Sequence, residues 1–270
     1  VHIGKRQDYR KYLNLIKNTK INSAVIFPHS SDISEAGRGL ITDEFSKKAR
    51  EIVNGYVLSL ADQVNKQSEK VYFFQFNFIW PDFDRKNLNR YLGVKWHRHD
   101  PDPKYNITGG EAEPSAGFNK LLDHLRDNKM PIIFEDDFEN LKTFIRLVDR
   151  ELPEERIRVI IPHLGFGTDS YEKIRKANIF ERGNVYTDTS YASKRSLDAI
   201  KDYLERYGND RIFFGSDFPF AHPKEELDRI LSLDISGEAK DAITRNNILK
   251  LLGGVREKTK DKESEEDEES

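Results

Sequence analysis

The sequence predicts an α/β protein that folds as a single-domain (β/α)8 barrel, the TIM-barrel architecture. Apolar runs typical of buried strands alternate with amphipathic helical stretches, and eight such runs fall within about 250 residues. No glycine-rich phosphate loop follows the first run, which argues against an open sheet that binds dinucleotides. Parallel strands joined by crossover helices account for this alternation, and eight strands are the number that closes into such a barrel.

The predicted strands are continuous or nearly continuous apolar runs, as expected for strands that are covered on both faces. "SAVIFP" and "VYFFQFNFI" show the pattern most clearly, whereas the first run, "VHI", is short. The eight runs span residues 1–3, 23–28, 71–79, 93–97, 131–135, 158–163, 184–189 and 211–217.

The predicted helices carry apolar residues at three- and four-residue spacing, which places those residues on one face. In residues 117–128, for example, Phe118, Leu121, Leu122 and Leu125 share a face. The helical stretches span residues 8–18, 43–66, 84–92, 117–128, 138–150, 170–181, 194–207, 223–233 and 236–252.

Composition divides the chain into a barrel domain, residues 1–253, and an acidic tail, residues 254–270. Residues 257–270 hold eight acidic and three basic residues and no aromatic ones, so we expect the tail to be disordered. Residues 257–270 account for −5 of charge in a chain whose net charge is −3, which leaves residues 1–256 near +2. Such a barrel has no strong electrostatic attraction for nucleic acid or for an anionic membrane.

Several absences narrow the class of protein further. The sequence has no cysteine, no signal peptide and no apolar run of about 18 residues. We therefore expect a soluble, cytoplasmic protein whose partner is a small-molecule substrate, and we leave a homo-oligomer open.

Polar residues gather where the predicted strands end, and in such barrels the C-terminal strand ends carry the chemistry. Six of the seven histidines lie at or just beyond strand ends, and only His124 lies inside a helical pattern. Imidazole and carboxylate groups that converge without thiolates suit a catalytic divalent cation such as zinc, manganese or iron. The residues concerned are His2, His29, Lys95, His97, His99, Glu135, His163, Asp188, Ser190, Asp217 and His222.

Each of these residues also has a simpler interpretation when it is taken alone. A histidine at a strand end can cap backbone groups, and Asp136 and Asp137 can cap the helix that follows them. Asp188 lies within a predicted strand and can be a buried hydrogen-bonding residue. A shared function explains the set His2, Glu135, His163 and Asp217 better than four separate structural roles do.

Seven motifs together resemble the amidohydrolase superfamily, and in particular its amidohydrolase-related group of metal-dependent hydrolases and nonoxidative decarboxylases. The resemblance extends from residue 1 to about residue 253 and implies a distorted (β/α)8 barrel. "GSDFP" and "PHLG" in this order are its most specific part. The motifs are "VHIG" (1–4), "GVKWH" (93–97), "PIIFE" (131–135), "IPHLG" (161–165), "NVYTDTS" (184–190), "FFGSDFPF" (213–220) and "RNNILKLLG" (245–253).

The resemblance implies a metal site formed by His2, Glu135, His163 and Asp217. His2 matches the second histidine of the group's His-x-His motif, and we expect the first histidine to precede Val1 in the natural protein. Glu135 stands where the group commonly has histidine, which is a departure that can alter the choice of metal. Zinc is the expected ion, manganese and iron are alternatives, and some members of the group work without a metal.

The function implied is a metal-dependent hydrolase in which bound water attacks the carbonyl of an amide, ester or lactone. Asp217 and His163 are the expected catalytic residues, and Arg38, Lys95, His97 and Ser190 are the expected substrate-binding residues.

Two loops are predicted to set substrate specificity, and two alternative functions stay open. The loops at 28–42 and 98–117 are expected to set specificity, with Arg98 and Lys104 as further candidates to bind a substrate carboxylate. A nonoxidative decarboxylase and a degenerate, non-catalytic barrel are the alternative functions.

Overall fold

The computed structural model describes most of the barrel. The described residues are 1–4, 8–29, 32, 44–68, 70–98, 107–108, 114–149, 156–165, 168–191 and 197–253. The predicted tail, residues 254–270, and the candidates Arg38, His99 and Lys104 lie outside these ranges. The predicted domain boundaries therefore stay a prediction.

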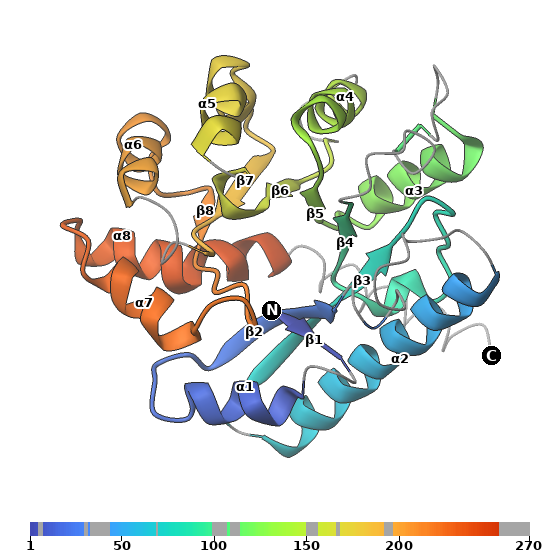
Figure 1. Ribbon diagram of the computed structural model, residues 1–270, viewed down its shortest axis with the longest axis horizontal. Coiled ribbons are helices and arrows are strands. Elements are labelled where there is room, and N and C mark those ends of the chain that lie inside the picture. The colour runs from blue at the N-terminus through green and yellow to red at the C-terminus, as the bar shows by residue number, and fades with distance from the viewer. Residues whose placement is uncertain are drawn as a thin grey trace.

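Eight parallel strands follow one another in sequence order around the sheet, and each is hydrogen-bonded to the next. The strands curl around a common centre with helices on the outside (Figure 1). The segment that follows the last strand reaches the first strand, where the backbone N–H of His2 donates to the carbonyl of Phe218 over 2.9 Å. This arrangement confirms the predicted (β/α)8 barrel. The strands are β1 His2–Ile3, β2 Ser23–Pro28, β3 Tyr72–Ile79, β4 Gly93–His97, β5 Ile132–Glu135, β6 Val159–Ile161, β7 Val185–Asp188 and β8 Ile212–Phe213.

Capping side chains mark the start of several helices. The side chain of Ser115 accepts from the N–H of Phe118 and caps α3, whose buried face is the predicted set of apolar residues. The helices are α1 Tyr9–Ile16, α2 Glu44–Gln67, α3 Ala116–Asp127, α4 Phe138–Val148, α5 Thr168–Lys176, α6 Leu197–Tyr207, α7 Pro223–Leu231 and α8 Gly237–Asp241. A π-helical turn, η8 Ala242–Asn246, continues α8 into a last helical segment at 247–253.

The prediction of a helix at residues 84–92 is wrong. The structure has only a short 3-10 turn there, η2 Leu88–Arg90, so β3 runs to β4 without an α-helix between them. The side chain of Asp84 accepts from the N–H of Lys86, and Asn87 has a left-handed backbone with a φ of 58°. Side chains that bond nearby backbone groups compete with helix formation.

Two of the predicted strands end earlier than expected. Strand β8 stops at Phe213, so residues 214–217 form a turn rather than the strand tip. Strand β6 stops at Ile161 and gives way to a 3-10 turn, η5 Pro162–Leu164. The turn residues His163 and Asp217 both have a positive φ, 58° and 53°, a conformation that few residues other than glycine adopt.

A stack of four aromatic side chains supports the wall formed by β3, β4 and β5. Ring centroids are separated by 5.9 Å between Trp80 and Trp96, 6.1 Å between Trp96 and Phe134, and 4.2 Å between Phe134 and Phe144. All four side chains are buried, and aromatic side chains of this size contribute most of a core's apolar contact. This packing holds the ends of β4 and β5 in fixed positions. Within the described residues no helix is long and apolar enough to span a membrane.

Candidate active site

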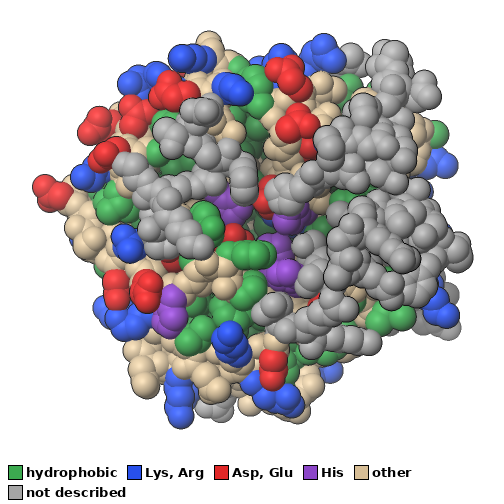
Figure 2. Space-filling view, in the orientation of Figure 1, with side chains coloured by type: hydrophobic (Ala, Val, Ile, Leu, Met, Phe, Trp, Pro, Cys, Tyr) green, Lys and Arg blue, Asp and Glu red, His purple; other side chains and the backbone are tan. Residues whose placement is uncertain are grey.

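The ends of the strands bring most of the predicted site residues together at one mouth of the barrel. Lys95 and His97 lie two positions apart on β4 and share a face, and His97 pairs in register with Glu135 at the end of β5. His163, Ser190 and Asp217 lie in the turns that follow β6, β7 and β8. Histidine and acidic side chains gather near the centre of this face of the molecule (Figure 2).

The carboxylate of Glu135 is shared by three basic side chains. Its Oε2 accepts a hydrogen bond from Nζ of Lys95, and its Oε1 lies 3.5 Å from Nε2 of His97 and 3.7 Å from Nε2 of His163. Burial alone would raise the pKa of the Glu135 carboxyl, but the charges of His97, Lys95 and His163 hold that pKa well below its usual range. Glu135 is therefore an ionised carboxylate at the centre of the site.

A second pair joins the first strand to the turn that follows the last strand. Nε2 of His2 lies 3.4 Å from Oδ1 of Asp217. Burial lowers the pKa of His2 to about 4, so its imidazole is neutral at pH 7. Burial opposes ionisation of Asp217, but the hydrogen bond from His2 and the charge of His163 keep its pKa below the usual value. Asp217 is thus an ionised carboxylate that can accept a proton.

The pKa of His163 is shifted in the opposite direction to that of His2. Burial would lower the pKa of His163, but the hydrogen bond to Glu135 and the charges of Glu135, Asp188 and Asp217 raise it. Its other ring nitrogen, Nδ1, lies 2.7 Å from the hydroxyl of Ser190, which in turn contacts Asp188. The imidazolium form of His163 is therefore favoured, and this form can donate a proton.

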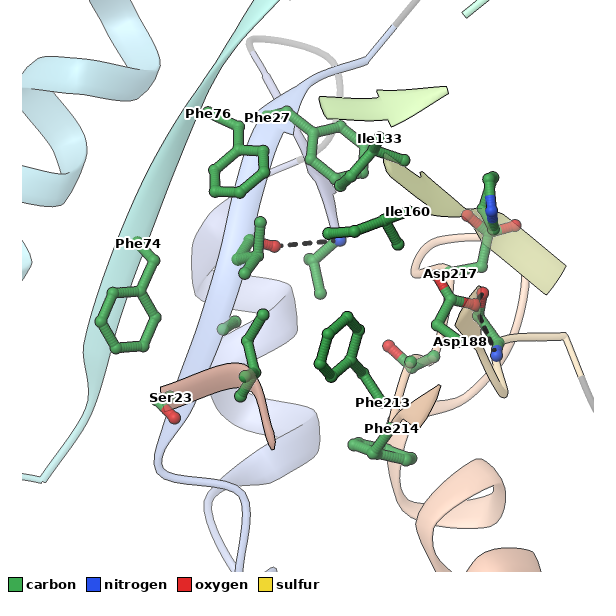
Figure 3. A pocket seen from close by; sticks show the side chains of 18 of the residues that line it. Ser23, Phe27, Phe74, Phe76, Ile133, Ile160, Asp188, Phe213, Phe214 and Asp217 are labelled. Carbon is green, nitrogen blue, oxygen red and sulfur yellow. Dashed lines mark hydrogen bonds between the residues drawn. The ribbon is translucent and has the colours of Figure 1, made fainter. Parts of the chain in front are cut away.

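A cavity of about 130 Å³ leads from these polar groups into the barrel. Asp188 and Asp217 lie on one side of it, and aromatic and aliphatic side chains surround the rest (Figure 3). Lys95, His163 and Ser190 also line its polar end. The cavity thus has one charged end and an otherwise mostly apolar wall.

Two residues at the mouth were not predicted as site residues. Phe220 is 47% exposed, and its ring stacks on His29 at 5.5 Å between centroids and meets His2 edge-on at 5.7 Å. Asp188, noted among the polar residues at strand ends but given no role in the predicted site, accepts hydrogen bonds from the backbone N–H groups of His163 and Ser190. The motif "GSDFPF" contains the signal for Phe220, because a large apolar residue directly follows the turn at the strand tip.

Arg98 has partners within the protein. Its guanidinium donates to Oδ1 of Asp136 over 2.8 Å and lies 3.3 Å from Oδ2 of Asp137. Asp137 also caps α4 by accepting from the N–H of Asn140, as the simpler interpretation of this residue expected. The contacts of Arg98 give no indication of a role in binding a substrate carboxylate.

The described residues do not complete the predicted four-ligand metal site. His2 and Asp217 form an imidazole–carboxylate pair of suitable donor chemistry, but Glu135 is hydrogen-bonded to the ammonium of Lys95. Within the described ranges, no group of three or more His, Cys, Asp or Glu side chains is arranged to hold an ion. Two of the four predicted ligands therefore fit a metal, and Glu135 fits an internal ion pair instead.

The fold and this acid–base site define the class of a barrel enzyme with its chemistry at the C-terminal strand ends. The sequence model of the amidohydrolase family matches residues 109–254, and the chain belongs to this family. The enzymes of the amidohydrolase-related group include hydrolases and decarboxylases.

Solved structures support the same fold. The chain resembles 2,6-dihydroxybenzoate decarboxylase from Rhizobium, with a TM-score of 0.63 and 17% identity over 92% of this chain and 88% of that one. It also resembles dihydroxybenzoic acid decarboxylase from Polaromonas sp. JS666, a structure with bound manganese and the inhibitor 2-nitroresorcinol. The TM-score is 0.65 and the sequence identity is 19%, over 92% of this chain and 86% of that one. A candidate 2-pyrone-4,6-dicarboxylic acid hydrolase from Pseudomonas putida has a TM-score of 0.61 and a sequence identity of 16%, over 92% of this chain and 88% of that one. At these identities the likeness shows the fold alone.

Proposed function

We propose that this protein hydrolyses an amide, ester or lactone bond of a small molecule, with Asp217 as general base and His163 as general acid. One observation carries the proposal: at a single mouth, the pKa of Asp217 is lowered and the pKa of His163 is raised. Titratable groups whose environments push their pKa values apart are the pairs that divide acid and base roles.

The reaction follows from these two protonation states. Asp217 accepts a proton from a water molecule as the water oxygen bonds to the carbonyl carbon of the substrate. Nε2–H of His163 first stabilises the negative charge that forms on the carbonyl oxygen, and His163 then gives its proton to the departing amine or alcohol. The carbon–nitrogen or carbon–oxygen bond breaks, and proton exchange with solvent returns both residues to their starting states.

Substrate binding is proposed for Lys95, His97, Ser190 and Arg38, together with Phe220. The apolar cavity wall and the exposed ring of Phe220 support a small substrate with a planar or apolar part. Lys95 and His97 lie at the charged end of the same region.

A divalent ion, zinc before manganese or iron, remains part of the proposal. His2 and Asp217 are the described residues that would hold it, and a further donor would have to come from outside the described ranges. When bound, such an ion would supply Lewis acidity and lower the pKa of a water molecule.

Nonoxidative decarboxylation is the second candidate, and the raised pKa of His163 favours it as well. In that reaction His163 would protonate the carbanion that remains after carbon dioxide departs. Two of the similar solved structures are dihydroxybenzoate decarboxylases. A non-catalytic barrel would turn over neither kind of substrate.

The experiment is a screen of amides, esters, lactones and carboxylated aromatic acids with the full-length natural protein and added zinc or manganese. Hydrolysis in H₂¹⁸O places one ¹⁸O atom in the product acid. Decarboxylation instead releases carbon dioxide and takes one deuteron from D₂O into the product.

The base is tested by Asp217→Asn, which keeps the size of the side chain and removes its charge. We expect a loss of about 10²–10⁴ in kcat, the usual contribution of a general base. Asp228→Asn is the matched control, because Asp228 is an exposed residue of α7 paired only with Lys224 among the described residues. Full activity of Asp217→Asn would overturn the assignment.

A further inference from the structure

Asp188 lies directly behind His163 and gathers three hydrogen bonds on one oxygen. Its Oδ1 accepts from the backbone N–H of His163 over 3.0 Å, from the backbone N–H of Ser190 over 2.9 Å and from the hydroxyl of Ser190. The same hydroxyl oxygen lies 2.7 Å from Nδ1 of His163. His163 and Ser190 are both buried.

This arrangement determines which ring nitrogen of His163 carries hydrogen. Oδ1 of Asp188 receives two backbone N–H groups and therefore acts as an acceptor. The hydroxyl of Ser190 has a single hydrogen, which it donates to Asp188. The oxygen of Ser190 can then only accept from His163, so Nδ1 of His163 is the nitrogen that bears hydrogen.

We propose that Ser190 and Asp188 are positioning residues that hold His163 as the Nδ1–H tautomer and leave Nε2 as its proton-transfer atom. Nε2 faces Oε1 of Glu135 at 3.7 Å, on the side of the barrel mouth. The inference rests on the proposed role of His163 in proton transfer, and it applies equally to hydrolysis and decarboxylation.

The backbone around the pair is shaped to permit this contact. His163 has a φ of 58°, and its N–H bond to Asp188 helps to hold that unusual conformation. Gly215 supplies the room: a Cβ there would lie 2.8 Å from Cβ of Ser190 and 3.2 Å from Cγ and Oδ1 of Asp188. Any side chain at Gly215 would displace one of the two residues.

The test reads the tautomer directly and needs no substrate. In protein labelled with ¹⁵N-histidine, long-range ¹H–¹⁵N spectra above the pKa of His163 distinguish the two neutral tautomers, and His163→Gln identifies the signal. We expect Nδ1–H in the natural protein. In Ser190→Ala we expect a shift toward Nε2–H, because Nδ1 loses its acceptor while Nε2–H can still donate to Glu135.

Ser190→Thr retains the hydroxyl and should restore the Nδ1–H signal. Gly215→Ala should reduce it, whereas Gly183→Ala should leave it unchanged, since a Cβ at Gly183 meets no atom within 4 Å. An Nε2–H signal in the natural protein, or an unaltered signal in Ser190→Ala, would overturn the proposal. Neither result depends on whether Asp217 is a base, so failure here is distinct from failure of the proposed hydrolysis.

Discussion

At the scale of single residues, Glu135 shows how a substitution can change a site without removing it. The resemblance places a carboxylate where a metal-binding histidine is common, and the structure surrounds that carboxylate with Lys95, His97 and His163. A buried carboxylate needs a positive partner, and here lysine provides one. The sequence identified these four residues but gave no distance between them, so it could not predict that Glu135 binds lysine.

Removing one partner of this ion pair should lower the free energy of unfolding strongly. Replacing both partners with apolar residues should lower it much less. Lys95→Met leaves Glu135 charged without its closest partner, and we expect a loss of about 3–5 kcal/mol in the free energy of unfolding. Adding Glu135→Leu should recover most of this loss, because two apolar side chains need no partner. Urea titrations of the three proteins measure the effect, and an unchanged midpoint for Lys95→Met would contradict the ion pair.

The protonation states also predict the dependence of activity on pH. Asp217 must be ionised, and since its pKa is lowered, kcat/KM should rise with pH below about 3.9, the usual value for aspartate. His163 must be protonated, and since its pKa is raised, kcat/KM should fall with pH above about 6.5. His163→Gln should lose the falling limb in its residual activity. A fall centred below pH 6.5 in the natural protein would contradict His163 as the acid.

At the scale of elements, α4 connects the site to the helical layer. Asp137 caps the helix, and Asp136 beside it accepts from Trp96 and Arg98, so the two carboxylates after Glu135 have structural partners. Asp137→Ala should lower the free energy of unfolding by about 1 kcal/mol, the usual effect of losing an N-cap. Asp123→Ala on the exposed side of α3 is the control, and equal midpoints for the two variants would show that the cap contributes nothing.

Most elements could be predicted because their apolar residues repeat at strand or helix spacing. The helix predicted at 84–92 is absent for a local reason. The side chain of Asp84 accepts a hydrogen bond from the N–H of Lys86, and Asn87 has a left-handed backbone, and both features favour a turn. The spacing of apolar residues carries no information about either feature. The early ends of β6 and β8 have a similar cause, since hydrogen-bonded pairing sets strand ends and the apolar run continues past the last pair. The contacts of Ser190 depend on both turns, which explains why its partners could not be read from the sequence.

At the scale of the whole molecule, the barrel should fold without the acidic tail. Residues 254–270 have too few apolar side chains to offset the entropy of ordering them. Deleting them should leave the thermal midpoint nearly unchanged, as measured by circular dichroism at low and high salt. A large decrease that disappears at high salt would mean that the tail binds the barrel through its charge.

The aromatic stack beside β3 and β4 also provides a fluorescent reporter of this wall of the barrel. Both tryptophans of the chain, Trp80 and Trp96, belong to it, and the indole N–H of Trp96 donates to Asp136, the neighbour of Glu135. The tryptophan fluorescence of the protein, excited at a wavelength that tyrosine does not absorb, therefore comes from the wall that carries Lys95 and Glu135. A ligand that enters the mouth and alters this wall would change the emission, so binding could be followed by fluorescence before any turnover is found.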